Sequence, residues 1–305
     1  MRRQPATAGR HRGTRDVLRR AESEIYFEVT GSGPALVFAH GLGGNHLSWW
    51  QQVPYFCDRY TCVTFSHRGF PPSVNVSGRI GHEAFADDLA ALLDHLAIAE
   101  AYLVAQSMGG WTCLTYALRA PARVRGLVLS SSTGTIDFAA IDHPAIAGLP
   151  SWNERSLAER RRLEAMGVMA STGSRMAHEQ PETYFLYEEL YHLTQASYKD
   201  SVRRSTRGSR NLPPQRVREI RTPVLLIVGE EDLIFPPMAA AAVASLIPGA
   251  RLHEVPKAGH SVYFERPEAY NRAVDAFLAE HSGIATREAA ALAGARAIHE
   301  RPRES

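Results

Sequence analysis

The sequence contains little cysteine and no long apolar segment. Its 305 residues include three cysteines, Cys57, Cys62 and Cys113, none of them in C-x-x-C spacing. This sparse set indicates neither a redox or zinc site nor the disulfide framework of a secreted protein. We therefore expect a cytoplasmic location. No apolar run approaches the ~18 residues that a membrane helix needs, so we expect no membrane association.

Net charge is also low, at +2. This balance favours neither nucleic acid nor an anionic membrane as a partner. Seven arginines fall within the first 20 residues, and no apolar segment follows them as it would in a secretory signal. We expect residues 1–21 to form a disordered basic arm.

Motifs that hold cofactors are missing as well. The chain contains no H-E-x-x-H, no P-loop and no G-x-G-x-x-G after an expected strand. The sequence therefore predicts neither a metal site nor an organic cofactor. Its length and its 45% hydrophobic content suit one globular domain with room for an insertion.

Apolar runs alternate with helical periodicity along most of the chain. Residues 83–97, for example, place leucines on one helical face and aspartates on the other. The alternation predicts a parallel, doubly wound sheet. The expected strands are residues 24–29, 35–39, 60–65, 102–105, 124–129, 223–228 and 251–255, and the expected helices are residues 83–97, 111–119, 238–247 and 267–278.

The alternation stops in residues 135–217, where helices are expected at 157–169 and 181–198. We interpret this stretch as a helical cap inserted between the core segments 22–134 and 218–282, with 283–305 as a tail. Side chains that could line an apolar pocket under the cap are Met166, Met169, Met176, Tyr184, Phe185, Tyr187 and Tyr191. Arginines expected to form a solvated face of the cap are Arg203, Arg204, Arg207 and Arg210.

Ser107 lies at a tight corner of the chain. The expected strand at 102–105 leads directly through Ser107 into a helix, and only small residues, Ala105, Gly109 and Gly110, flank it. Such a corner holds its serine in a strained backbone conformation and exposes the hydroxyl. The hydroxyl also lies at a helix N-terminus, where amide dipoles favour a developing negative charge.

Two further polar residues follow apolar strands. Asp232 comes after the strand expected at 223–228, and His260 after the strand at 251–255. The carboxyl ends of parallel strands meet at one edge of a sheet, so these side chains should meet Ser107. A serine needs an imidazole to take its proton, and a carboxylate fixes the imidazole tautomer. Asp137, which follows an earlier strand, is a second candidate for the acid.

These segments resemble those of the α/β-hydrolases. Ala105-Gln106-Ser107-Met108-Gly109 is similar to the Gly-x-Ser-x-Gly nucleophile elbow, with Ala105 at the first glycine. The loop from Gly229 to Pro236 resembles the family's acid loop, and Ala258-Gly259-His260 resembles its histidine loop. The chain order of serine, aspartate and histidine also agrees. The resemblance covers residues 24–279 and implies the α/β-hydrolase fold, a mostly parallel doubly wound sheet with an inserted helical cap.

The resemblance also implies roles for other residues. His40-Gly41-Leu42-Gly43-Gly44 is similar to the family's His-Gly-x-x-Gly loop. It implies an oxyanion hole formed by the backbone amides of Leu42 and Met108. Ser66 to Ser73 is similar to a family segment in which Arg68 would be structural. We expect substrate contacts from His40, Trp49 and Trp111.

The sequence therefore predicts a serine hydrolase that cleaves a carboxylic ester or lactone. Its expected partner is a small, largely apolar substrate, and the oligomeric state stays open. Three alternatives remain: hydrolysis of an activated C–C bond, cofactor-free perhydrolysis, or a receptor that binds its ligand without turnover. The Ser-Met-Gly-Gly sequence at the elbow is similar to that of perhydrolases.

Overall fold

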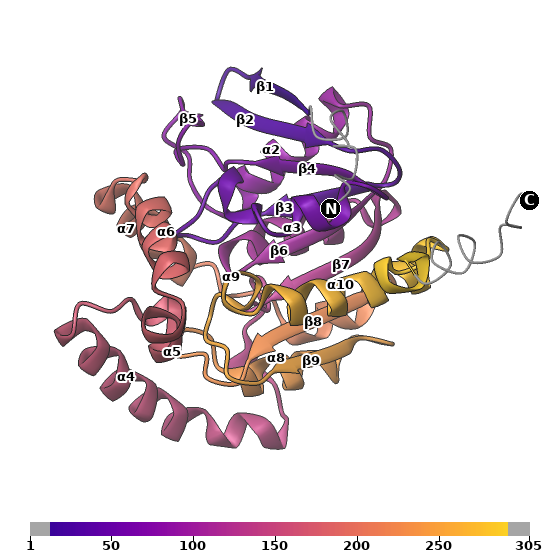
Figure 1. Cartoon of the computed structure of the whole chain (residues 1–305). Coiled ribbons are helices and arrows are strands. Elements are labelled where there is room, and N and C mark those ends of the chain that lie inside the picture. The colour runs from indigo at the N-terminus through magenta and orange to yellow at the C-terminus, as the bar shows by residue number, and fades with distance from the viewer. Residues whose placement is uncertain (1–12, 292–305) are drawn as a thin grey trace, which may run out of the picture.

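The computed structural model describes residues 13–291. Within them, nine strands form one sheet at the centre of the molecule (Figure 1). The order across it is β1, β2, β4, β3, β6, β7, β8, β9, and β5 pairs with β2. The strands are β1 (Thr14–Arg19), β2 (Ser23–Thr30), β3 (Ala35–Ala39), β4 (Thr61–Phe65), β5 (Val74–Asn75), β6 (Ala101–Gln106), β7 (Val124–Ser130), β8 (Val224–Gly229) and β9 (Arg251–Val255).

The strands from β4 to β9 in this order run parallel, and β1, β2 and β5 are antiparallel to their partners. The predicted fold class, a mostly parallel doubly wound sheet of the α/β-hydrolase type, is confirmed. The parallel register brings the carboxyl ends of β3, β6, β8 and β9 to one edge, and the polar loops begin there.

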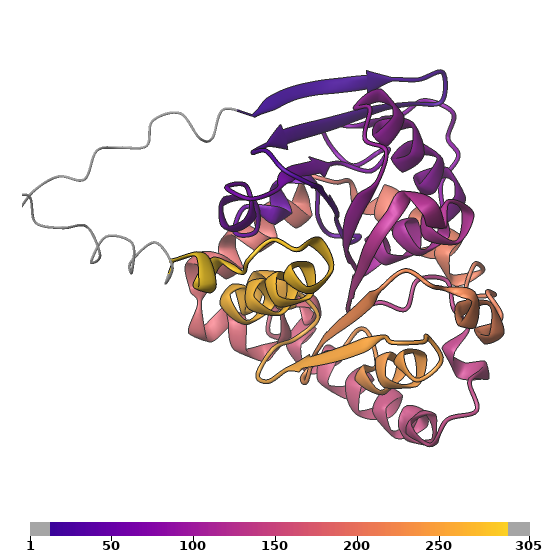
Figure 2. The same ribbon diagram turned by 90° about the vertical axis from the view of Figure 1, so that its right-hand side faces the viewer.

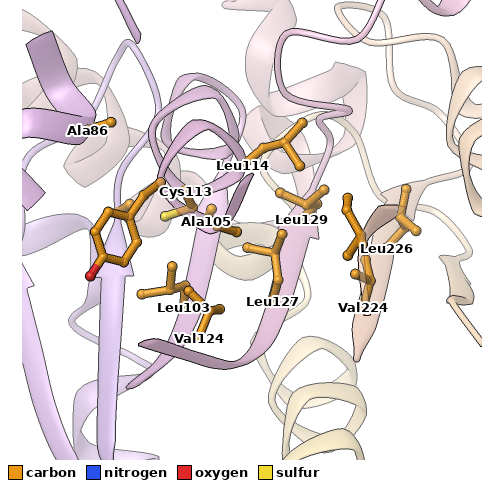
Figure 3. Close-up of a cluster of buried hydrophobic side chains, with 14 of the residues drawn as sticks. Ala86, Leu103, Ala105, Cys113, Leu114, Val124, Leu127, Leu129, Val224 and Leu226 are labelled. Carbon is orange, nitrogen blue, oxygen red and sulfur yellow. The ribbon is translucent and has the colours of Figure 1, made fainter. Parts of the chain in front are cut away.

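Successive residues of the central strands pack into two apolar layers on opposite faces of the sheet. Leu103 and Ala105 of β6 pack with Leu127 and Leu129 of β7 and with Cys113 of α3 (Figure 3). The alternate residues pack against α10 on the opposite face. Figure 2 shows α10 on one side of the sheet and α2 and α3 on the other. The helices of this core are α1 (Val53–Phe56), α2 (His82–His95), α3 (Met108–Arg119), α8 (Pro237–Ala244), α9 (Val262–Glu265) and α10 (Pro267–Ser282), with the 3-10 helices η1 (His46–Trp49) and η2 (Pro121–Arg123).

The prediction of a disordered arm over residues 1–21 is wrong for its second half. Residues 14–19 form β1, which pairs antiparallel with β2, and Arg15 forms an ion pair with Glu28 at 3.2 Å. The arginine-rich composition hid this strand, because charged side chains are compatible with the edge of a sheet. Residues 1–12 lie outside the described residues.

Of the predicted tail, the part from residue 292 onward also lies outside the described residues. The described part packs on the core, because the backbone amide of Arg287 donates to the Asp275 carboxylate at 2.7 Å. Arg68, expected to be structural, is buried and binds Asp88 of α2 at 2.6 Å, which ties the loop after β4 to that helix.

The chain is helical between β7 and β8, where residues 131–223 contribute one isolated β-bridge and no named strand. We refer to residues 138–219 as the helical segment. Its longer helices α4 to α7 group at one end of the strands (Figure 1). One predicted helix over 181–198 is in fact two, separated at residues 193–195. The helices are η3 (Phe138–Ala140), η4 (Pro144–Gly148), α4 (Leu149–Ala165), η5 (Ala170–Thr172), α5 (Gly173–Glu179), α6 (Pro181–His192), α7 (Ala196–Arg207) and η6 (Pro214–Glu219).

The helical segment contacts the loops that follow β3 and β9. The Tyr187 and Ser261 hydroxyls are 2.9 Å apart. At Gly43 a Cβ atom would lie 2.6 Å from the Tyr191 ring, so a larger residue there would require the ring to move. In residues 13–291 no helix has the length and apolar character needed to cross a bilayer.

Candidate active site

The corner between β6 and α3 holds Ser107 in the predicted strained conformation, with φ +49° and ψ −111°. A positive φ is costly for a residue with a side chain, so packing must enforce it. The enforcing contact is at Gly109, where a Cβ atom would lie 2.1 Å from the Ala39 carbonyl oxygen. Helix α3 can press against β3 only because this position carries no side chain. The predicted backbone strain is thus confirmed.

A continuous hydrogen-bond chain runs from Ser107 through His260 to Asp232. Nε2 of His260 lies 2.9 Å from Oγ of Ser107. Nδ1 of His260 lies 2.9 Å from Oδ2 of Asp232 and 3.1 Å from Oδ1. An ionised carboxylate only accepts hydrogen bonds, so it places the imidazole proton on Nδ1. Nε2 is then left with a lone pair directed at the serine hydroxyl, the geometry that a general base requires.

Asp232 is itself held rigidly. Its side chain is buried, and Oδ1 accepts hydrogen bonds from the backbone amides of Ile234 and Phe235, both at 2.8 Å. The other candidate acid, Asp137, precedes η3, and its amide donates to the Leu212 carbonyl. Among the described residues Nδ1 of His260 bonds to Asp232, and no hydrogen bond joins His260 to Asp137. The geometry therefore favours Asp232 over Asp137.

The two backbone amides expected to form an oxyanion hole belong to residues that line the same cavity as Ser107. Met108 is the first residue of α3, so its amide has no acceptor within the helix. The Gly41–Leu42 peptide is fixed through its carbonyl. Nδ1 of His40 donates to this oxygen at 2.7 Å, and the Gly44 amide donates to it at 3.0 Å. Because a peptide is planar, fixing the carbonyl also fixes the direction of the Leu42 N–H.

The expectation that His40 and Trp49 contact substrate is wrong. Both side chains are fully buried, and neither lines the cavity. Burial lowers the pKa of His40 to about 3, so its ring is neutral. Nε2 of His40 accepts from the His67 amide at 2.9 Å. Trp49 packs between Phe38 and Tyr263, with ring centroids 5.1 Å and 4.7 Å away.

Trp111, the third expected contact, does line the cavity. It lies one helical turn after Ser107 on α3, so the two side chains share one helix face. The sequence could not separate Trp111 from Trp49, because both follow strands that end at the same edge of the sheet.

Glu265 is a buried residue near the site that the sequence analysis missed. Its carboxyl group accepts hydrogen bonds from the amides of Gly259 at 2.7 Å and Ser261 at 3.0 Å, the two residues that flank His260. Burial raises its pKa from 4.5 to about 8, although both amides act in the opposite direction. An acidic residue directly after the apolar Val262-Tyr263-Phe264 run was the available signal.

A cavity of about 880 Å³ opens over Ser107 and His260. Of the side chains expected to line it from the helical segment, Met169, Tyr187 and Tyr191 do so. Met166 and Phe185 are instead more than half exposed, and Met176 is buried in the core. Of the arginines expected to form a solvated face, Arg204 and Arg210 are exposed and Arg203 is partly exposed, and two of this set also reach the cavity wall. These are Arg203 and Arg210.

The wall around the cavity is mixed. Apolar side chains surround the serine, and charged side chains from the helical segment complete the lining. The apolar members include Leu42, Met108, Trp111, Val168, Met169, Val202, Ile234 and Tyr263, and the charged members include Arg160, Arg161, Glu164, Glu188, Arg203 and Arg210. Among residues 13–291 no group of three or more histidine, cysteine or acidic side chains is placed to hold a metal ion.

Comparison with known proteins shows the family of the chain. Residues 34–267 match the family model of the alpha/beta hydrolase fold. The chain belongs to the α/β-hydrolase family, and it is a hydrolase.

Individual relatives cover two thirds of the chain or more. It is 29% identical over 256 residues to 3-oxoadipate enol-lactonase 2 of Acinetobacter baylyi, covering 80% of this chain and 88% of the relative. It is 32% identical over 223 residues to 2-hydroxymuconate semialdehyde hydrolase of Pseudomonas putida, covering 68% of this chain and 72% of the relative. Among solved structures, Est816, described as an N-acyl homoserine lactone degrading enzyme, is 25% identical with a TM-score of 0.71, covering 86% of this chain and all of that one.

Proposed function

We propose that the protein hydrolyses a carboxylic ester or lactone through an acyl-enzyme on Ser107, with His260 as general base and Asp232 as its orienting acid. The observation that carries this proposal is the Ser107–His260–Asp232 hydrogen-bond chain, which opens into the cavity. The enol-lactonase and the homoserine lactone degrading enzyme among its relatives support the choice of substrate class. The helical segment serves as the cap.

In the first half-reaction, Oγ of Ser107 attacks the substrate carbonyl carbon as its proton passes to Nε2 of His260. Asp232 stabilises the imidazolium that forms. The amides of Leu42 and Met108 donate to the tetrahedral oxyanion, and one such donor is typically worth about 3 kcal/mol. When the intermediate collapses, the C–O bond to the alcohol breaks, and His260 returns the proton to the leaving oxygen.

In the second half-reaction, water replaces the alcohol. His260 takes a proton from the water as it attacks the acyl carbon, and a second tetrahedral oxyanion forms in the same position. Its collapse releases the carboxylic acid and restores the Ser107 hydroxyl. For a lactone the alcohol and the acid remain in one molecule, and the product is a hydroxy acid.

A panel of p-nitrophenyl esters, simple lactones and β-diketones, assayed with and without added peroxide, tests this function. We expect turnover of esters or lactones that does not depend on peroxide. Turnover of diketones alone would favour C–C hydrolysis, and activity only with peroxide would favour perhydrolysis. Saturable ligand binding with no turnover of any class would favour the receptor alternative.

A further inference from the structure

The cavity over Ser107 carries more positive than negative side chains. Four arginines line it, against two glutamates. The arginines come from two separate parts of the helical segment. Arg160 and Arg161 lie on α4, Arg203 lies on α7, and Arg210 follows α7. Two separate parts of the chain therefore contribute positive charge to one cavity, which the charged outer face of a single helix would not do.

We propose that this cavity selects substrates that carry an anionic group, a carboxylate, beyond the acyl chain attached to the scissile carbonyl. The proposal rests on the proposed function, because it assigns the substrate class to the same site. It also refines the expectation of a largely apolar substrate: the part beside the serine is apolar and the far end is charged.

Arg210 is the arginine most directly linked to the reaction centre. Its guanidinium carbon lies 5.3 Å from the centre of the Trp111 ring and 5.5 Å from that of Phe138. Trp111 follows Ser107 by four residues on α3, a rise of about 6 Å along the helix axis. The cation, Trp111 and Ser107 border one cavity, so a substrate bound there can contact Arg210 with a carboxylate at the far end of its acyl chain.

The stacking of Arg210 is compatible with anion binding. A guanidinium offers a flat face to aromatic rings and carries its N–H donors along its edge. A planar guanidinium can therefore remain on Trp111 while it donates two parallel hydrogen bonds to a carboxylate. Trp111 at the same time offers an apolar surface to the chain that links the carboxylate to the scissile carbonyl.

Arg203 is positioned by its neighbours in the cavity wall. It donates to the Tyr191 hydroxyl at 2.9 Å and to Asp200 at 2.6 Å. The Asp200 side chain is about half exposed, so solvent screens this ion pair. Tyr191 lines the cavity as well, so the bond to its hydroxyl holds the Arg203 charge at the wall.

The two glutamates do not cancel this positive charge. Glu188 accepts a hydrogen bond from the Tyr184 hydroxyl at 2.8 Å, and Glu164 is exposed on α4. Neither forms a salt bridge with Arg203, which pairs with Asp200 instead, among the ion pairs of the described residues. With four arginines against two glutamates in the lining, an anionic substrate meets more positive than negative side chains in the cavity.

The test compares two esters of one shape, mono-p-nitrophenyl glutarate and its neutral methyl ester. We expect wild-type protein to hydrolyse the anionic ester with about tenfold higher kcat/KM, the size typical of a charged hydrogen bond. Arg210→Gln and Arg203→Gln should each reduce this ratio, mainly by raising KM for the anionic ester, because the charge is remote from the reacting bond. High salt should also reduce the ratio of the kcat/KM values of the two esters.

Two variants serve as controls. Arg204 is the neighbour of Arg203 on α7 but is exposed and does not line the cavity, so Arg204→Gln should keep the full ratio. Arg210→Lys keeps the charge and should retain part of the preference for the anionic ester. A ratio near one in the wild type, or a ratio unchanged in the Arg203→Gln/Arg210→Gln double variant, would overturn the proposal.

A binding arm separates this proposal from the proposed function. Ser107→Ala protein is titrated with monomethyl glutarate and with dimethyl glutarate by calorimetry. Tighter binding of the anion that depends on Arg210 would uphold the anion site even if no ester were hydrolysed. Ester hydrolysis without any preference for the anion, in turnover and in binding, would leave the proposed function intact and reject the anion site.

Discussion

At the residue scale, three separate constraints act on the oxygen of Ser107. The positive φ of the residue directs its side chain out of the sheet, and the start of α3 places beside it the Met108 amide, which has no acceptor within the helix. Nε2 of His260 then approaches to 2.9 Å. The close packing at this corner and the approach of His260 involve residues remote from Ser107 in the sequence, so the chain must be folded before the hydroxyl can act as a nucleophile.

Replacement of Asp232 tests how the imidazole is oriented. We expect Asp232→Asn to reduce kcat for p-nitrophenyl acetate on the order of 10⁴-fold, because an amide no longer fixes the Nδ1–H tautomer. Asp137→Asn is the matched control and should retain near-wild-type kcat. The reverse result, with loss in Asp137→Asn and activity in Asp232→Asn, would transfer the role of the acid to Asp137.

Glu265 makes stability depend on pH. Its folded-state pKa is raised from 4.5 to about 8, so between these values the folded protein holds a proton that the unfolded chain releases. Its stabilising contribution is complete below about pH 4.5 and is lost as pH rises through about 8. We therefore expect the free energy of unfolding to fall more between pH 5 and pH 9 in the wild type than in Glu265→Gln.

Urea unfolding at both pH values measures this difference. Parallel changes in the wild type and in Glu265→Gln would show that the carboxyl group does not titrate in this range. The comparison needs no active enzyme, so it remains valid whatever the variant does to turnover.

At the scale of elements, the corner between β6 and α3 is the most constrained part of the fold. Helix α3 lies so close to β3 that a Cβ atom at Gly109 would overlap the Ala39 carbonyl, at 2.1 Å. The contact is with backbone, which cannot rotate away as a side chain can. The same close approach keeps Met108, a proposed oxyanion donor, beside the loop that carries Leu42.

We expect Gly109→Ala to destabilise the protein by about 1–3 kcal/mol, the usual cost of overpacking, and to reduce kcat because Met108 must shift. Gly148→Ala is the control, since its φ of −78° suits any residue and its nearest neighbour would lie 4.0 Å away. It should stay within about 0.5 kcal/mol of the wild type. Equal stability of the two variants in urea unfolding would contradict the packing argument.

Elements whose signal is local could be predicted from the sequence. The apolar run of β3 set its bounds, and the small residues around Ser107 indicated the corner. The break between α6 and α7 was missed because residues 193–195 contain neither glycine nor proline. Thr194 is buried there, so tertiary packing and not local propensity ends the helix.

The candidate site also has a part that the sequence predicts and a part that it does not. Ser107, Asp232 and His260 each follow a recognisable strand, so parallel topology alone brings them to one edge. The direction in which His40 and Trp49 point depends on packing against residues distant in sequence, such as His67 and Tyr263. Nothing in the sequence pattern records those contacts, so the expected substrate contacts were wrong.

At the scale of the whole molecule, the sheet supplies the reacting groups and the helical segment encloses them. The hydrogen bond between Tyr187 and Ser261 joins the segment to the residue that follows His260. Four arginines from the segment line the cavity, while the apolar walls near Ser107 include Leu42 and Trp111. The packing of the helical segment over the sheet decides which faces of α4 and α7 turn toward the cavity. The sequence alone could therefore not predict the charge of the cavity.

The formation of a covalent adduct on Ser107 tests the central claim most directly. The protein and its Ser107→Ala variant are treated with a fluorophosphonate, digested and mapped by mass spectrometry. The account predicts one equivalent of adduct on Ser107 in the wild type and none at any position in the variant, because this oxygen lies 2.9 Å from Nε2 of His260, the base that activates it. An unlabelled wild type, or an adduct on another residue that persists in Ser107→Ala, would contradict it.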